Sequence, residues 1–275
     1  YDSKIARTAY LAALESLIAR TAHLGIERVV FPIGNDFLHS DNKHGTTTHG
    51  TPLDNDSRYH RTYLEGRRLL TTAIDRLRWV TPVEVVVVPG NHDTVSAFTL
   101  GEALSCYYHA TPDVTVRNEP IPRKYVGFGR NLILFTHGDK GKKANYPLLM
   151  ATEQPEAFAA AQFREAHVGH THELRVTEHM GVRIRVSPAL CPPDAWHSEL
   201  HFVGNLRSAE AFVWSRDQGI VAMAFYTVPL DKTNSLCQTA PRDDGRDQSD
   251  PHDSSAPIGP GGLRPPPRRR RRSAI

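Results

Sequence analysis

The sequence predicts an α/β fold on three observations. Four consecutive valines at 85–88 form an apolar, β-branched run that is typical of a strand buried on both faces of its sheet. Pro89 and Gly90 end this run abruptly. Short apolar runs and helical patterns alternate through the first two thirds of the chain, which is typical of a sheet with helices packed on it.

Helical spacing of apolar residues predicts long helices over residues 3–23, 59–79 and 95–107. Gly25 is suited to end the first of them, and Asn55, Asp56 or Ser57 is suited to cap the second. Two shorter helical pieces, separated at Pro155, are expected over 144–163.

Apolar runs predict the strands. They cover residues 28–33, 85–88, 131–137 and 165–172, and a second sheet is expected from 182–186, 211–215 and 220–227. Residues 40–58 show no periodicity and are rich in Asp, Asn, Thr, Gly and His, which predicts a long loop. The segment 238–275 is dominated by Pro, Gly, Ser, Asp and Arg, which predicts a disordered tail.

Composition limits the class of protein. With 275 residues and 39% hydrophobic content, the chain is long enough to bury a sizeable core. Cys106, Cys191 and Cys237 are widely spaced and form no Cys-x-x-Cys pair, which argues against a disulfide framework or a cysteine zinc site. No apolar run approaches membrane-spanning length, and the first residues show no signal pattern. We therefore expect a soluble cytoplasmic protein without membrane contacts.

The formal net charge of +3 comes from the tail. Residues 240–275 contain eight arginines and five aspartates, so the rest of the chain is neutral. A neutral body does not indicate a general nucleic-acid-binding surface, so any such contact depends on a local patch or on the tail.

Polar side chains follow four successive predicted strands. They are Asp36, then Asn91 with His92 and Asp93, then His137, and finally His170 with His172. Because the carboxyl ends of strands in an open α/β sheet meet at one edge, we expect these groups to converge. Mixed oxygen and imidazole ligands suit Mn²⁺, with Fe, Zn²⁺ or Mg²⁺ as alternatives. Taken singly, each residue also has an ordinary interpretation as a turn, cap or buried polar residue.

The residues that follow these predicted strands resemble the motifs of the calcineurin-like metallophosphoesterase superfamily. The matching motifs are Gly34-Asn-Asp36, Gly90-Asn-His-Asp93, Thr136-His137-Gly138 and Gly169-His-Thr-His172, in that order. The resemblance covers roughly residues 3–227 and is nearest to SbcD-like DNA repair nucleases and exonuclease-type members common in phages. It implies a four-layer α/β/β/α sandwich over residues 1–230 that holds two metal ions.

The resemblance also implies a role for each residue. Asp36 would bridge the two metals, and His172 would serve one of them. The other metal would be completed by Asn91, His137 and His170. Two cations held close together can clamp a phosphate and activate water for in-line attack. His92 would stabilise the phosphate oxygens or protonate the leaving oxygen, and Asp93 would orient His92 by a hydrogen bond.

Two departures from the family pattern matter. The first family motif, Asp-x-His, is absent except for Asp250-Pro-His252 in the tail, which we interpret as coincidence. We therefore expect a domain without its first strand, about one bound metal per chain, and weak or no activity. Asn35 stands where the family usually has its bridging aspartate, so the bridging role falls to Asp36. Asp36 and His39 then match the Asp-x-x-His of SbcD-like nucleases, which makes His39 either a phosphate contact or an ordinary loop histidine.

The leading functional hypothesis is a metal-dependent phosphodiesterase that acts on DNA. Lys140, Lys142 and Lys143 follow His137 and are suited to contact a phosphate backbone, or form an ordinary solvated loop. The alternatives are a phosphatase or phosphodiesterase for nucleotides or small molecules, and a non-catalytic metal-binding protein. Trp196 is expected at the rim of the site or in the core, and His197 at the rim.

Overall fold

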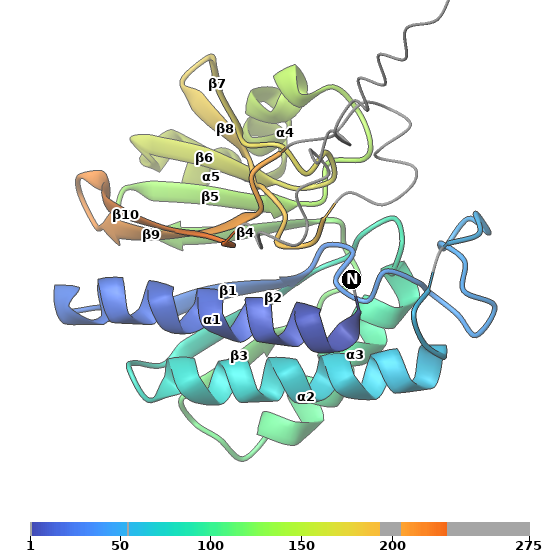
Figure 1. Ribbon diagram of the computed structural model, residues 1–275. Helices are drawn as coiled ribbons and strands as arrows, with labels where there is room; N and C mark the ends of the chain where they lie inside the picture. The colour runs from blue at the N-terminus through green and yellow to red at the C-terminus, as the bar shows by residue number, and fades with distance from the viewer. Residues whose placement is uncertain (1, 54, 193–204, 230–275) are drawn as a thin grey trace, which may run out of the picture. The chain divides into compact units, whose positions relative to one another are not determined.

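The computed structural model describes residues 2–53, 55–192 and 205–229, and these belong to one unit, Tyr1–Pro229 (Figure 1). Trp196, His197 and the predicted tail over 238–275 lie outside the described residues. In the described part of the chain, helices surround a three-stranded, a five-stranded and a two-stranded sheet. This arrangement confirms the predicted α/β class.

The first sheet is parallel and has the order β1-β2-β3. Its strands are β1 (Val29–Gly34), β2 (Val83–Val88) and β3 (Val114–Arg117). The helices that pack on it are α1 (Ser3–Thr21), α2 (Tyr59–Arg78) and α3 (Thr94–Tyr108). Apolar residues from these helices and from one face of the sheet form one hydrophobic core, in which Leu70 and Ile74 of α2 are fully buried.

The second sheet has the order β4-β5-β6-β8-β7. Its strands are β4 (Arg123–Phe128), β5 (Asn131–Thr136), β6 (Phe163–Val168), β7 (Arg175–His179) and β8 (Val182–Val186). The inner strands β5, β6 and β8 run parallel, and the outer strands pair antiparallel. The short 3₁₀ turn η2 (Lys143–Asn145) leads into α4 (Tyr146–Glu153), which packs with α5 (Pro155–Ala160) on one face.

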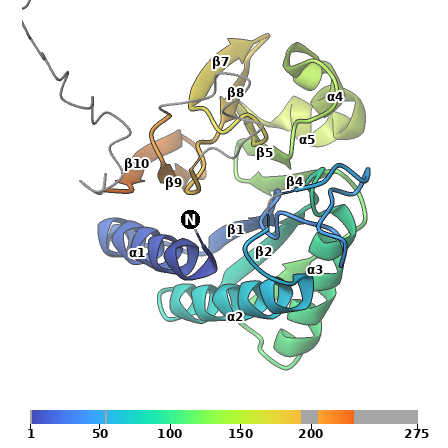
Figure 2. The ribbon, with the colours of Figure 1, turned by 45° about the vertical axis from the view of Figure 1, so that its right-hand side comes forward.

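Strand β2 contributes to two cores. Val85 and Val87 face the core beneath α1–α3, whereas Val86 and Val88 pack against residues of β4 and β5. The predicted burial of this strand on both faces is therefore confirmed. Figure 2 shows α1–α3 on one outer side and α4 and α5 on the other. The hairpin of β9 (Ser208–Ser215) and β10 (Gly219–Thr227) forms the two-stranded sheet, and its Trp214 packs on the core between the larger sheets.

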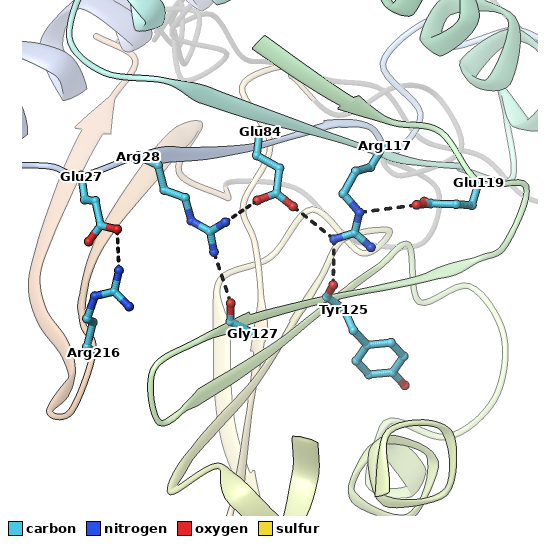
Figure 3. Close-up of polar contacts among 8 residues, drawn as sticks. All are labelled: Glu27, Arg28, Glu84, Arg117, Glu119, Tyr125, Gly127 and Arg216. Atoms are coloured by element: carbon cyan, nitrogen blue, oxygen red, sulfur yellow. Dashed lines mark hydrogen bonds and ion pairs between the residues drawn. The ribbon is translucent and has the colours of Figure 1, made fainter. Parts of the chain in front are cut away.

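Charged side chains join the first sheet to strand β4 near the amino-terminal ends of β1 and β2 (Figure 3). Glu84 pairs with Arg28 at 2.8 Å and with Arg117 at 3.2 Å. The same two arginines donate to backbone carbonyls of β4, Arg117 to Tyr125 at 2.8 Å and Arg28 to Gly127 at 3.2 Å. We call Arg28, Glu84 and Arg117 the arginine ladder. Its two arginines satisfy two backbone carbonyls of the edge strand β4 and connect β4 to the first sheet.

Most predicted elements are present, and three expectations need correction. The cap of α2 is Arg58, which makes no side-chain cap, whereas Asp56 accepts from the Ser3 backbone N–H of α1 at 2.7 Å. Strands β3, β4 and β7 were not predicted, because they are short or carry no clear alternation. The strands predicted over 182–186, 211–215 and 220–227 do not form one sheet. Residues 182–186 pair with β6, whereas β9 and β10 pair with each other. In the described part of the chain, the helices are too short or too polar to cross a bilayer.

Candidate metal centre

Four predicted ligands follow the carboxyl ends of parallel strands. Asp36 and Asn91 stand within three residues of the ends of β1 and β2, and His137 and His170 within two residues of the ends of β5 and β6. The two larger sheets therefore each contribute two groups, as expected for polar residues at the carboxyl edge of α/β strands.

These four side chains meet at the His137 ring. Its Nε2 atom lies 2.6 Å from Asn91 Oδ1, 3.1 Å from Asp36 Oδ2 and 3.2 Å from His170 Nδ1. Donor atoms bound to one cation at about 2.1 Å stand roughly 3.0–3.4 Å apart. The separations of His137 Nε2 from Asp36 and His170 therefore fit a shared coordination sphere, whereas its contact with Asn91 is shorter. The ligand atoms of Asp36, His137 and His170 all lie within 4.8 Å of one another. The arrangement fits one divalent cation with mixed oxygen and nitrogen ligands.

The other nitrogen of His137 explains how its ring is oriented. Nδ1 contacts the side-chain oxygen of Asn35, so the ring donates through Nδ1 and presents Nε2 to the other three side chains. Burial and the neighbouring His137 lower the pKa of His170, which keeps its imidazole neutral. Burial acts to raise the pKa of Asp36, but its hydrogen bond to His137 and the nearby histidine charges outweigh this and lower it. These shifts favour an ionised Asp36 and a neutral His170, the forms in which these residue types bind metals.

The tips of β1 and β2 hold each other through reciprocal hydrogen bonds. The His92 backbone N–H donates to Asp36 Oδ1 at 2.8 Å. In return, the fully buried Asp93 carboxylate accepts from the backbone N–H groups of Asp36 at 3.3 Å, Leu38 at 3.0 Å and Gly90 at 3.2 Å. Burial and the charge of Asp36 raise the pKa of Asp93 to about 7. Asp93 therefore fixes the loop that carries a metal ligand, and its predicted hydrogen bond to His92 stays a prediction.

Backbone strain is concentrated at this site. Of the six non-glycine residues with positive φ in the described part of the chain, five belong to the strand tips, and they are Asn35, Asp36, His39, His170 and His172. Such conformations cost of order 1–3 kcal/mol each and occur where the surroundings enforce them. Glycines allow the tips to approach: a Cβ at Gly90 would collide with Asp36, and a Cβ at Gly169 with the Asn35 side chain. The chain therefore accepts local strain to bring these side chains together.

The remaining predicted residues lie in different places. The rings of His39 and His92 are neighbours, with centroids 5.6 Å apart and planes at 48°. The backbone oxygen of His172 accepts from Asn205 Nδ2 at 3.2 Å. Among the described residues, the group that could hold a metal comprises Asp36, His137 and His170, so the assignment of His172 to a second metal stays a prediction.

Lys140 and Lys142 are exposed and Lys143 is half-buried, on the loop that follows His137. Burial lowers the pKa of Lys143, with the nearby Glu173 acting against that shift and Arg175 adding to it. Lys140 and Lys142 are therefore accessible on a segment that follows a candidate metal ligand.

Two site residues were missed by the sequence reasoning. Asn35 departs from the family pattern in the sequence, and the structure shows that its side-chain oxygen contacts His137. Its place directly before Asp36 is the sequence signal that points to it. Asp41 was not noted at all, although α3 needs an acceptor for its first-turn amides and Asp41 provides one. The sequence gives no signal for this pairing, because the partners are more than 50 positions apart.

No protein-family model matches the chain, and no curated protein matches it. A solved structure that resembles it is that of the hypothetical protein PH1004 from Pyrococcus horikoshii OT3, with 13% identity, coverage of 81% of this chain and 84% of that chain, and a TM-score of 0.40. A likeness at this level carries no argument about function. The functional conclusion therefore depends on the site residues themselves.

Proposed function

We propose that this protein is a metal-dependent phosphoesterase that hydrolyses phosphodiester bonds, and that it belongs to the calcineurin-like metallophosphoesterases. The observation that carries this proposal is the convergence of Asp36, Asn91 and His170 on the Nε2 atom of His137. Helices on the outer faces of two facing sheets support the further proposal of a four-layer α/β/β/α sandwich. The family motifs predict these ligands by position, and the separations of His137 Nε2 from Asp36 and His170 are compatible with a shared cation.

The metal would be held by Asp36, Asn91, His137 and His170, and Mn²⁺ is the ion we expect. A divalent cation supplies Lewis-acid activation of a phosphate ester and of water when bound. Asp36 contributes an ionised carboxylate, since its pKa is lowered. His137 contributes Nε2, because Nδ1 is engaged with Asn35. Asp36 and His137 also keep their places without the metal, through hydrogen bonds to the β2 tip and to Asn35.

His92 and His39 are the groups we assign to the substrate. The His92 backbone N–H donates to Asp36 Oδ1, which ties His92 to a candidate ligand. A protonated imidazole there donates to a phosphoryl oxygen or passes its proton to the leaving oxygen. The His39 ring is its neighbour and supplies a second donor to the same phosphoryl group.

DNA is the substrate class that we favour within this function. The Asp36–His39 spacing resembles that of DNA repair nucleases, and Lys140 and Lys142 present accessible cations beside His137. Lysines at such positions bind backbone phosphates and make affinity fall with salt. Nucleotide or small-molecule phosphoesters remain the same-class alternative.

The test measures metal stoichiometry and hydrolysis together. We expect calorimetry to find one tightly bound Mn²⁺ per chain, and bis-p-nitrophenyl phosphate to be hydrolysed only with the metal present. DNA binding should weaken as salt rises from 50 to 200 mM, by about tenfold or more for a few phosphate contacts. A chain that binds no Mn²⁺, or hydrolyses equally well after chelation, would contradict the proposal.

A second candidate is a metal-binding protein without catalysis. It is favoured because the candidate ligand group in the described residues accounts for one cation, whereas the family mechanism uses two. One tightly bound Mn²⁺ with no turnover of either bis-p-nitrophenyl phosphate or DNA would select this candidate.

A further inference from the structure

Helix α3 is capped from a distant part of the chain. Its N-cap residue, Asp93, makes no side-chain cap, because its carboxylate accepts from backbone amides elsewhere. The first turn donates instead to Asp41. Ser96 N lies 2.7 Å from Oδ1 and Val95 N lies 3.2 Å from Oδ2. Both carboxylate oxygens are engaged, so the start of α3 is fixed relative to residue 41.

Thr48 strengthens the same contact. Its hydroxyl donates to Asp41 Oδ2 at 2.7 Å and accepts from the Thr94 backbone N–H at 3.3 Å. The intervening loop is held by its own hydrogen bonds, from Asn42 Nδ2 to Thr46 Oγ1 at 2.8 Å and from Asp41 N to Thr46 O at 2.9 Å. This segment is therefore an ordered loop docked on the first turn of α3.

The docked loop connects, through its hydrogen bonds, the segments that carry the two histidines assigned to the substrate. His39 precedes Asp41 by two residues, and His92 precedes Thr94 by two residues. Ser40, which links His39 to Asp41, is 2% exposed and has little room to move. The hydrogen bonds of Asp41 thus join two backbone segments that begin two to four residues after the two histidines, although Asp41 contacts neither ring in the bonds described.

We propose that Asp41 is a positioning residue that keeps the His39 and His92 rings at the separation suited to one phosphoryl group. The inference rests on the proposed function only for what the two rings bind. Two imidazoles with centroids 5.6 Å apart can donate to separate oxygens of one tetrahedral phosphoryl group. Displacement of such groups by about 1 Å is sufficient to slow a reaction by about 100-fold.

The experiment compares Asp41→Ala and Asp41→Asn with a matched control, Asp2→Ala. Asp2 caps α1 by accepting from Ile5 N at 2.8 Å, so the control also removes one capping carboxylate. The first readout is the nuclear Overhauser effect between the His39 and His92 ring protons, in metal-free protein because Mn²⁺ broadens the signals. The second is kcat and KM for bis-p-nitrophenyl phosphate, and the third is Mn²⁺ affinity.

We expect Asp41→Ala to lose the His39–His92 Overhauser effect and to lower kcat by about 10- to 100-fold. Mn²⁺ affinity should stay within about twofold, because the metal ligands are held by contacts that do not involve Asp41. Asp41→Asn keeps an oxygen acceptor for Ser96 and should retain part of both signals. The Asp2→Ala control should retain both in full.

Two results would overturn the inference: an unchanged Overhauser effect in Asp41→Ala, or an equal loss in Asp2→Ala. If Asp41→Ala does not fold, Asp41→Asn gives the same comparison. The inference and the proposed function can also fail separately. Loss of the Overhauser effect in Asp41→Ala, together with no hydrolysis by the unmodified chain, would support the positioning role and reject the phosphoesterase.

Discussion

The two ends of strands β1 and β2 arrange their polar groups in opposite ways. At the amino-terminal ends, the arginine ladder alternates positive and negative groups, and Glu84 satisfies two guanidinium groups that also donate to carbonyls of β4 (Figure 3). At the carboxyl ends, Asp36 and Asn91 crowd around His137 Nε2 together with His170 of the second sheet, and Asp36 and His170 have positive φ. The ladder is complete within the protein, whereas the candidate metal centre is the group that we propose to hold a cation.

This difference indicates where free energy is gained in each region. In the ladder, each hydrogen bond to a charged group contributes about 1.5–3 kcal/mol to the folded chain itself. At the candidate metal centre, crowded donor atoms and strained backbone lower the stability of the metal-free protein, and under our proposal a bound cation would restore it. Substitutions should therefore affect unfolding in one region and metal affinity in the other.

The largest effect is expected for His137→Ala, which removes the atom on which the other ligands converge. Mn²⁺ affinity should fall by at least about 100-fold, since loss of second-sphere partners alone costs 10- to 100-fold. The rise in Tm that Mn²⁺ gives the unmodified chain should disappear. Thermal unfolding with and without Mn²⁺ measures both. His179→Ala on the exposed strand β7 is the control, and a variant that still gains stability from Mn²⁺ would refute the ligand assignment.

The next largest effect is expected for a glycine-to-alanine substitution at the candidate metal centre, compared with the same substitution in β4 beside the arginine ladder. Gly90→Ala places a Cβ against the Asp36 side chain and backbone N–H, so it should displace Asp36 and weaken Mn²⁺ binding by about 10- to 100-fold. Gly127→Ala in β4 is the matched control, because its Cβ would meet no atom within 4 Å. It leaves the Gly127 carbonyl free to accept from Arg28. Calorimetric titration with Mn²⁺ measures both variants, and equal affinities would show that the tight packing at Gly90 is irrelevant to the metal.

Sequence patterns could predict that the four candidate ligands lie close together, but not which residues hold them in place. Asp36, Asn91, His137 and His170 each follow an apolar strand, and the carboxyl ends of such strands meet by the geometry of the sheet. The contact of Asn35 with His137, by contrast, joins residues 102 positions apart. It depends on how the two sheets are stacked, which no local pattern specifies.

The same reason explains the errors in the predicted fold. Long amphipathic helices such as α2 were predicted from periodicity, but the cap expected from Asp56 was not found, since that carboxylate bonds to Ser3 of α1 instead. Strand β3 has four residues and is defined mainly by its pairing with β2. Tertiary contacts decide such elements, and a single sequence does not encode them locally.

In the arginine ladder, Glu84→Gln should destabilise the fold without changing Mn²⁺ affinity. The substitution leaves Arg28 and Arg117 without their shared carboxylate, and we expect a loss of about 1–3 kcal/mol in urea unfolding. Glu65→Gln, which removes an exposed pair with Arg61, is the control and should cost less than about 0.5 kcal/mol. A change in Mn²⁺ affinity for Glu84→Gln would mean that the two ends of the strands are coupled.

The smallest effect is expected for the pH dependence of folding stability, to which the buried His167 contributes. His167 of β6 lies between the sheets, where its side chain is 10% exposed and rests on Phe135 of β5 and on Phe212 and Trp214 of β9. Burial, together with the charge of Arg185, lowers the pKa of His167 to about 3. In the unfolded chain an ordinary histidine titrates near 6.5, so between these values the unfolded state binds the additional proton. Stability should therefore fall as the pH falls below about 6.5.

His167→Phe should remove this loss, and at pH 5 its stability relative to the unmodified chain should exceed the difference at pH 7 by about 1–2 kcal/mol. The charged neighbours of His167 also affect the pH dependence of stability. Glu165 lies 3.4 Å from His167 Nε2, and Arg185 pairs with both Glu165 and Glu210. Burial raises the pKa of both glutamates, so the folded state gains protons there as the pH falls and opposes the histidine. His179→Phe on exposed β7 is the control for the apolar substitution. Urea unfolding at both pH values decides: if His167→Phe has the same pH slope as the unmodified chain, acid sensitivity comes from another group. In that case the metal centre and the arginine ladder must be compared again at each pH.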